Sequence, residues 1–319
     1  MKRRILITGG NGYVGREVTR LLYGEHEVCV ADNLRTTASR FRSDERQRFR
    51  FARVDIADTG AIKALIDDFA PEIVIHLAAI HYIPECEAEP GQTVLTNVTG
   101  TVNLLEACPP EVRVVFASSG AVYKPDDRPH QEATGALEPN DVYGLSKLHG
   151  EHYVRYIARQ RHLSAVIVRL FNVIGPGETN PHLLPEIVAQ LKTGRKVVRL
   201  GNLWPRRDYI HIRDAARGFV ATALKHEVAA GDAVTVNLGT SRPYSVANVI
   251  SKLRAVADID FALEEDRGRV RRVDRPFLAA DNTQIRRLFG WEPTLTIDEA
   301  LSDLWREPDL SDALLAKYQ

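Results

Sequence analysis

Cysteine is scarce in this chain, and its positions form no recognisable pattern. Cys29, Cys86 and Cys108 are odd in number and show no paired spacing. They therefore predict neither a disulfide framework nor a cysteine-based zinc site, and we predict no bound metal.

Long apolar runs are also missing. No stretch of about 18 apolar residues occurs, so we expect no membrane-spanning helix. The apolar run near the N-terminus is too short for a secretory signal and leads directly into a glycine cluster. We therefore expect a cytoplasmic protein.

Neither sign of charge is in excess. The 42 Lys and Arg residues balance the 42 Asp and Glu residues, so bulk electrostatics indicate neither nucleic acid nor a membrane as a partner. A local basic patch could still bind one anionic small molecule. The length of 319 residues suffices for one large α/β unit or for two lobes that share a core.

Short apolar runs alternate with amphipathic segments in the first half of the chain. They predict buried strands at residues 4–8, 27–31, 73–77, 112–117 and 165–170. Between two of them, residues 59–69 have the apolar spacing of a helix, which Asp58 is suited to cap. The alternation predicts a doubly wound parallel α/β sheet of the Rossmann type, covered by helices on both faces.

The alternation loses its regularity after about residue 171. We predict a dinucleotide-binding domain over residues 1–171 and a smaller α/β substrate-binding lobe over residues 172–319. Segments at about 208–240 are expected to return in part to the first domain. Within this second half, a helix, a strand and a helix are expected near 183–193, 234–238 and 245–256.

The stretch TGGNGYVG at residues 8–15 has the spacing of a phosphate-binding turn. Gly9, Gly12 and Gly15 follow a predicted strand and open a predicted helix. Glycine lets the backbone turn tightly and approach a pyrophosphate, and the helix N-terminus offers unpaired N–H groups. A plain tight turn would also use glycines, but the strand and helix around them favour dinucleotide binding.

Acidic residues follow the second and third strands. Asp32 can accept hydrogen bonds from the adenosine ribose and would repel a 2′-phosphate, which favours NAD over NADP. It could equally be a solvated carboxylate, and the nearby Arg35 leaves NADP open. Asp55 is suited either to the adenine amino group or to helix capping.

Tyr143 and Lys147 are spaced to share one face of a helix. A phenol is a weak base at neutral pH, and we expect the neighbouring ammonium to lower the tyrosine pKa so that it can exchange a proton with a substrate hydroxyl. Ser119 ends another predicted strand, where ligands of open α/β sheets bind. It could hold the reacting oxygen or merely satisfy its own loop.

These features occur in order together with several others. The full set is TGGNGYVG, the ADNL strand end, HLAA at 76–79, TNVTGT at 96–101, SSGAVY at 118–123, YGLSK at 143–147, RLFNVIGPG at 169–177 and RRDYIHIRD at 206–214. In this set the chain resembles the extended short-chain dehydrogenase/reductase family, particularly its nucleotide-sugar epimerases and dehydratases, and is closest to the UDP-galactose 4-epimerase pattern.

The resemblance implies roles for individual residues. It implies a catalytic set of Ser119, Tyr143 and Lys147, and an NAD site to which Tyr143 and Lys147 also belong. The other implied cofactor residues are Gly9, Gly12, Tyr13, Val14, Gly15, Asp32, Asn33, Asp55, Ile56, Leu77, Ala78, Ala79, Asn97 and Phe171.

The resemblance also implies a nucleotide-diphosphate sugar as substrate. Its implied contacts are Ser119, Asn172 and Arg207, with a second pyrophosphate arginine at Arg271 or, if the register slips, at Arg269 or Arg272. His81, in the loop after HLAA, is either an acid–base group or a polar contact. Family members usually form homodimers, here through helices at about 93–107 and 142–160.

The residues after Ser119 distinguish the reactions of the family. Dehydratases resemble one another in an Asp-Glu pair there, whereas this chain has Gly120 and Ala121, which cannot transfer protons. The remaining set suffices for a 4-epimerase. A 4,6-dehydratase or 4-ketoreductase that uses His81 or another group stays an alternative, as does a non-catalytic dinucleotide sensor.

Overall fold

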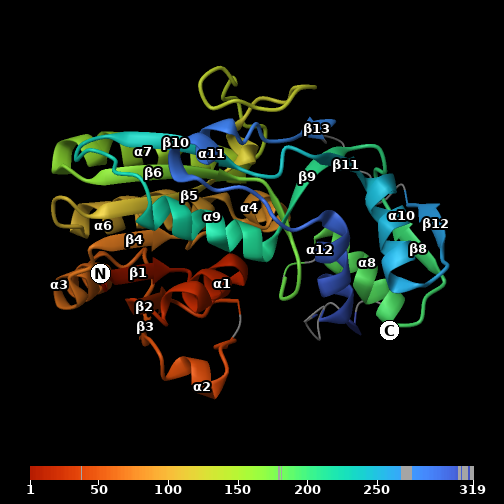
Figure 1. Ribbon diagram of the computed structural model, residues 1–319, viewed down its shortest axis with the longest axis horizontal. Helices are drawn as coiled ribbons and strands as arrows, with labels where there is room; N and C mark the ends of the chain where they lie inside the picture. The colour runs from red at the N-terminus through yellow and green to blue at the C-terminus, as the bar shows by residue number, and fades with distance from the viewer. Residues whose placement is uncertain are drawn as a thin grey trace.

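The computed structural model describes residues 1–36, 38–178, 180, 182–266, 275–307, 310 and 315–316. Its largest feature is a seven-stranded parallel sheet whose strands run in the order β10-β6-β5-β4-β1-β2-β3 (Figure 1). The strands are β1 Arg4–Thr8, β2 Glu27–Asp32, β3 Arg50–Arg53, β4 Ile73–His76, β5 Arg113–Ser119, β6 Ser164–Leu170 and β10 Ala233–Leu238. The predicted fold class is confirmed.

Helices cover both faces of this sheet, which explains why its strands are apolar throughout. In β1, Ile5 and Ile7 belong to the apolar cluster on one face, and Leu6 belongs to the cluster on the other. The first face carries α1 Tyr13–Leu22, α9 Ile212–Leu224 and α11 Thr283–Phe289. The second face carries α3 Thr59–Phe69, α6 Gly100–Ala107 and α7 Val142–Arg161.

Aspartate side chains cap the N-termini of two of these helices. The Asp58 carboxylate accepts a hydrogen bond from the Ala61 N–H at 2.9 Å, which confirms the predicted cap of α3. Asp141 caps α7 by accepting from the Gly144 N–H at 2.7 Å. The second cap sets where α7 begins, and therefore where Tyr143 and Lys147 lie.

The chain ahead of α6 is helical in three short pieces. They are α4 Ile83–Ala88, α5 Pro90–Val94 and the π-helix η1 Leu95–Thr99, which runs directly into α6. Two further short elements are α2 Ser43–Arg46 and the 3₁₀ turn η2 Gly120–Val122. The helix expected at 93–107 is therefore a continuous but irregular helical run.

A second apolar core lies at the other end of the molecule (Figure 1). It is built around α8 Leu183–Lys192, α10 Val246–Ala257 and α12 Ile297–Arg306. The small sheets beside these helices consist of β7 Asn172–Ile174, β8 Val197–Leu200, β9 Arg206–His211, β11 Pro243–Ser245, β12 Ala262–Glu265 and β13 Phe277–Leu278. Along the chain, α9 and β10 lie between segments of this second core, but they pack with the large sheet.

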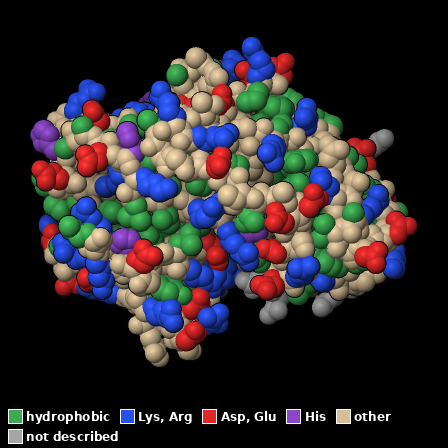
Figure 2. All heavy atoms as spheres, in the orientation of Figure 1, with side chains coloured by type: hydrophobic (Ala, Val, Ile, Leu, Met, Phe, Trp, Pro, Cys, Tyr) green, Lys and Arg blue, Asp and Glu red, His purple; other side chains and the backbone are tan. Residues whose placement is uncertain are grey.

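The surface is mixed in charge. Figure 2 shows basic and acidic side chains interspersed on the face that it presents, in keeping with the balanced totals of the sequence. Within the described residues, no helix combines the length and apolarity needed to cross a bilayer.

Candidate active site

A cleft of about 930 Å³ opens at the carboxyl ends of the large sheet and extends to the second core. Ligands of open α/β sheets bind at this edge. Most of the residues implied by the family resemblance line the cleft. They are Gly9, Gly12, Tyr13, Val14, Gly15, Asp32, Asn33, Ile56, Leu77, Ala78, Ala79, His81, Ser119, Tyr143, Lys147, Phe171, Asn172 and Arg207.

The glycine-rich turn packs too closely for side chains. Gly9 has a φ of +68°, and a Cβ there would lie 2.6 Å from the Ala78 nitrogen. A Cβ on Gly15 would lie 2.3 Å from the Gly9 carbonyl oxygen, so helix α1 approaches the turn directly. Among the described residues outside its own helix and its chain neighbours, a Cβ on Gly12, the N-cap of α1, would have only the Gly9 oxygen within 4 Å. This turn therefore leaves open backbone on the cleft and fits a dinucleotide pyrophosphate.

Asp32 lies where the ribose of a dinucleotide is expected. Its carboxylate accepts from the Asn11 and Leu34 N–H groups at 3.1 and 2.9 Å. Burial raises the pKa of Asp32, and these two hydrogen bonds oppose the rise. Arg35, which left NADP open, forms an ion pair with Glu85.

Two implied cofactor residues do not line the cleft. Asp55 accepts from the Asn33 side-chain amide at 3.0 Å, so it supports a cleft residue. Asn97 is buried and bonds both the N–H and the carbonyl of Ile80 at 2.8 Å. Asn97 therefore holds the backbone beyond HLAA in place, and its approach to the cofactor stays a prediction.

Ser119, Tyr143 and Lys147 come together at the cleft from β5 and α7. Tyr143 and Lys147 lie one turn apart on α7, and Ser119 is near enough to Tyr143 to lower the pKa of its phenol. The Lys147 ammonium donates to the Ala117 carbonyl at 2.8 Å and lies 5.9 Å from the centre of the Tyr143 ring. The arrangement can hold a proton between two hydroxyl groups beside a buried amine.

The predicted direction of the Tyr143 pKa shift is wrong for these side chains. Burial raises the pKa of Tyr143, and the side chain of Ser119 lowers it. The amine responds to the same enclosure, because burial lowers the pKa of Lys147 to about 8. Loss of hydration outweighs the expected help from the ammonium.

A buried ion pair joins α7 to β6, and it was not predicted from the sequence. Arg169 on β6 donates two hydrogen bonds to the Glu151 carboxylate at 2.8 and 2.7 Å. The Ser118 hydroxyl, next to Ser119, donates to the same carboxylate at 2.6 Å. In the sequence, the only hint of this role is that Glu151 follows Lys147 by one helical turn.

Phe171, an implied cofactor residue, lines the cleft together with Asn172 and Arg207, which are implied substrate contacts. Phe171 is buried, and a Cβ on Gly120 would lie 3.1 Å from its ring, so the two fit closely. Asn172 is exposed at the start of β7. Arg207 on β9 is half-buried and donates to the Arg275 carbonyl at 2.7 Å.

Arg271 and its alternatives Arg269 and Arg272 lie outside the described residues. Arg275, from the same arginine-rich stretch, is buried and donates to the Ala121 and Tyr123 carbonyls and to the Asn140 side chain, each at 2.7 Å. It ties the turn after Ser119 to the start of α7. Sequence analysis missed this role.

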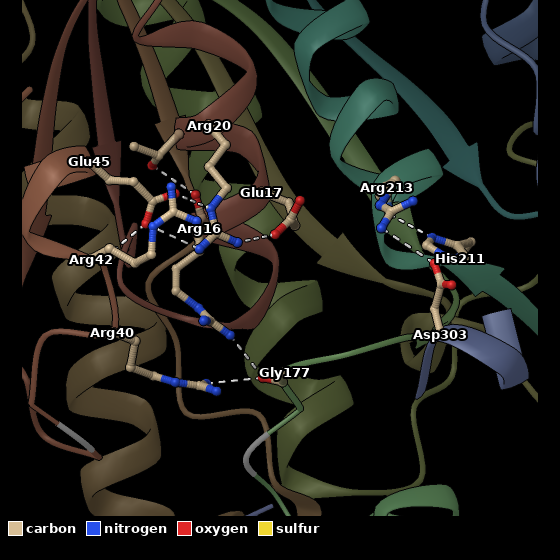
Figure 3. A network of polar contacts seen from close by, with 12 residues as sticks. Arg16, Glu17, Arg20, Arg40, Arg42, Glu45, Gly177, His211, Arg213 and Asp303 are labelled. Carbon is tan, nitrogen blue, oxygen red and sulfur yellow. Dashed lines mark hydrogen bonds and ion pairs between the residues drawn. The ribbon is translucent and has the colours of Figure 1, made fainter. Parts of the chain in front are cut away.

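Residues 175–177 are fastened to the dinucleotide side of the cleft. The guanidinium groups of Arg16 and Arg40 both donate to the Gly177 carbonyl, at 3.1 and 3.0 Å (Figure 3). The Tyr13 hydroxyl donates to the Gly175 carbonyl at 3.0 Å. Tyr13 was expected along the pyrophosphate, and it therefore also joins the glycine-rich turn to residues 175–177.

Comparison with known proteins agrees with this geometry. The model of the NAD dependent epimerase/dehydratase family matches residues 5–239. The chain belongs to that family. This confirms the resemblance drawn from the motifs, and it places the chain in an NAD-dependent family, as predicted.

Named relatives match over almost their whole length. The UDP-glucose 4-epimerase of Lactobacillus helveticus is 30% identical, with 95% of this chain and 96% of the relative covered. The solved UDP-glucose 4-epimerase of Brucella ovis in complex with NAD is 27% identical, covers 97% of this chain and 99% of its own, and has a TM-score of 0.84. The Bacillus cereus UDP-glucuronic acid 4-epimerase, solved with UDP-glucuronic acid and NAD, is 25% identical over 95% and 98% of the two chains, with a TM-score of 0.84.

Proposed function

We propose that this chain is a nucleotide-sugar 4-epimerase that keeps NAD bound throughout its reaction. The observation that carries the proposal is the Ser119–Tyr143–Lys147 set on the cleft, followed by Gly120 and Ala121 in place of proton-transferring carboxylates. The first lobe would hold the dinucleotide, and the lobe beyond residue 171 would hold most of the sugar nucleotide.

The cleft residues supply a site for the cofactor. The turn of Gly9, Gly12 and Gly15 would hold its pyrophosphate, and Asp32 its adenosine ribose. When bound, NAD supplies the redox chemistry, by accepting and returning the hydrogen and two electrons of the sugar C4–H bond. Because the net reaction is an inversion, no cofactor is consumed.

Tyr143 is the group that would exchange a proton with the sugar 4-hydroxyl, with Ser119 sharing that proton. Burial keeps the proton on the free phenol, so the transfer needs positive charge nearby. Protonated Lys147 is one source, and the oxidised cofactor carries charge of the same sign. Lys147 would also hold the nicotinamide ribose.

Asn172 and Arg207 would bind the diphosphate of the substrate, and a guanidinium suits it because it donates two parallel hydrogen bonds. Relatives of similar closeness are named for UDP-glucose and for UDP-glucuronic acid. We therefore propose a UDP-sugar as the first substrate to test.

The test is incubation of the purified protein with UDP-, GDP-, CDP-, ADP- and dTDP-sugars without added cofactor. Formation of the C4 stereoisomer supports the proposal, and Tyr143→Phe should slow it by about 10²- to 10⁴-fold. Accumulation of a 4-keto sugar in one direction would instead identify a dehydratase, and stoichiometric consumption of NADH or NADPH a reductase. Retention of full activity in Tyr143→Phe would refute the proposed mechanism.

We also propose a homodimer formed through α7 and the helical run 90–107. These elements pack together and carry exposed large apolar side chains, namely Val94, Leu95, Leu145, Tyr153 and Tyr156. Light scattering should give twice the chain mass. Replacing Tyr156 with Glu should shift the protein toward the monomer, and a wild-type monomer would contradict the proposal.

A further inference from the structure

Two histidines and a glutamate meet at the cleft from distant parts of the chain. His81 follows β4, whereas Glu178 and His182 lie between β7 and α8. One potential ligand atom from each side chain lies within 4.8 Å of the other two. All three residues line the cleft.

The His81 ring presents a hydrogen-bond acceptor at this corner of the cleft. Its Nε2 lies 2.9 Å from the Asn180 side-chain nitrogen, and it accepts that hydrogen bond because an amide nitrogen can only donate. Nε2 therefore carries a lone pair, and a neutral imidazole nitrogen with a lone pair is the group that binds a metal ion.

The side chains of Glu178 and His182 lie at the same corner of the cleft. Glu178 is only 7% exposed, and its carboxylate accepts from the Asn180 N–H at 3.0 Å. The His182 ring lies 6.0 Å from the His81 ring and packs edge-on against Tyr82 at 5.6 Å. A buried carboxylate and two oriented imidazoles thus share one corner of the cleft.

We propose that His81, Glu178 and His182 bind a divalent transition-metal ion, with zinc as the preferred metal. Two imidazole nitrogens and one carboxylate are a donor set that zinc accepts, whereas magnesium and calcium prefer oxygen ligands throughout. Metal binding replaces the contact of His81 with Asn180. Three protein ligands leave at least one position of the ion open to the cleft, where an oxygen of a bound ligand can occupy it.

Sequence analysis predicted no metal because His81 lies about a hundred residues from Glu178 and His182, and the three form no motif. The proposal does not depend on the epimerase reaction, because its test measures metal binding rather than turnover. Failure of one would therefore leave the other standing.

The test is equilibrium dialysis of the full-length protein against zinc, with the bound metal measured by mass spectrometry. We expect one zinc ion per chain, and binding weakened by at least about tenfold in His81→Ala, His182→Ala and Glu178→Gln. The matched control is the double variant His149→Ala/His152→Ala, which removes two exposed histidines three residues apart on α7 and should bind zinc like the wild type.

A second measurement covers ligand variants that fail to fold. Cobalt(II) added to the wild-type protein should give the intense visible absorption of a four- or five-coordinate ion, and zinc should displace it. Absence of stoichiometric zinc, equal binding in the folded ligand variants, loss of binding in the α7 control, or a weak octahedral cobalt spectrum would each overturn the proposal.

Discussion

The two walls of the cleft are built in different ways. On the dinucleotide side, the glycine-rich turn is eight consecutive residues, and Tyr143 and Lys147 lie one turn apart on a single helix. On the opposite side, Gly175, Glu178, Asn180 and His182 belong to one segment of the chain, and Arg207 belongs to another. The geometry of the first wall follows from local backbone structure, which a short sequence motif can predict. The geometry of the second wall depends on how the two lobes pack against each other.

Arg207 and Arg275 show what this difference means for single residues. Both belong to arginine-containing stretches that the sequence associated with a diphosphate. Both line the cleft, but the guanidinium of Arg275 is buried and bonds backbone carbonyls beside Ser119, whereas Arg207 is half-buried. A motif identifies the residue type, but the tertiary contacts decide how deeply the side chain is buried and what it bonds.

The largest expected loss of activity comes from a substitution in the dinucleotide side of the cleft. Tyr143→Phe removes the proton-exchanging hydroxyl and should lower kcat by about 10²- to 10⁴-fold. The NAD content of the purified protein should stay unchanged. Tyr156→Phe, which removes an exposed hydroxyl from the same helix, is the control and should keep wild-type kcat. A loss of less than tenfold in Tyr143→Phe would show that another group moves the proton.

Comparison of Arg275→Met with Arg207→Met would sharpen the contrast between the two arginines. Arg275→Met leaves two carbonyls and an amide oxygen without their charged donor and should cost about 3 kcal/mol of unfolding free energy in urea titrations. It should also lower kcat, because the turn after Ser119 loses its tie to α7. Arg207→Met should chiefly raise KM for the sugar nucleotide. The same kinetic effect in both variants would contradict the distinction.

The burial of Lys147 predicts that the unfolding free energy depends on pH. Its pKa in the folded protein is about 8, below the ordinary 10.5, so the unfolded chain binds more protons between these values. The unfolding free energy of the wild type should therefore rise with pH across this window relative to Lys147→Met. Urea unfolding of both proteins at intervals from pH 7 to 10.5 tests this. Parallel curves would show that Lys147 is better hydrated than its surroundings indicate.

The smallest effect is expected away from the cleft. Asp58→Ala removes the cap of α3 and should lower the unfolding free energy by about 1 kcal/mol. Activity and NAD content should not change. Asp58→Asn retains an acceptor and should recover most of the stability, whereas a loss of activity in Asp58→Ala would link α3 to the cleft.

The strand and helix pattern was predictable because burial imposes it on each segment separately. The continuous apolar runs of β1, β5 and β6 indicated a parallel sheet covered on both faces, and the structure has that sheet. Contacts between distant segments were not predictable. The hold of Asn97 on Ile80 and the pairing of Glu151 with Arg169 depend on which surfaces meet.

The sequence by itself determined the class of the fold, the glycine-rich turn and the spacing of Tyr143 and Lys147, because each follows from the geometry of a short stretch of backbone. Only the tertiary structure decided that the pKa of Tyr143 is raised, that the Arg275 guanidinium is buried, and that His81 lies close to Glu178 and His182. Hydration and side-chain proximity are properties of packed surfaces, and they exist only once the chain has folded.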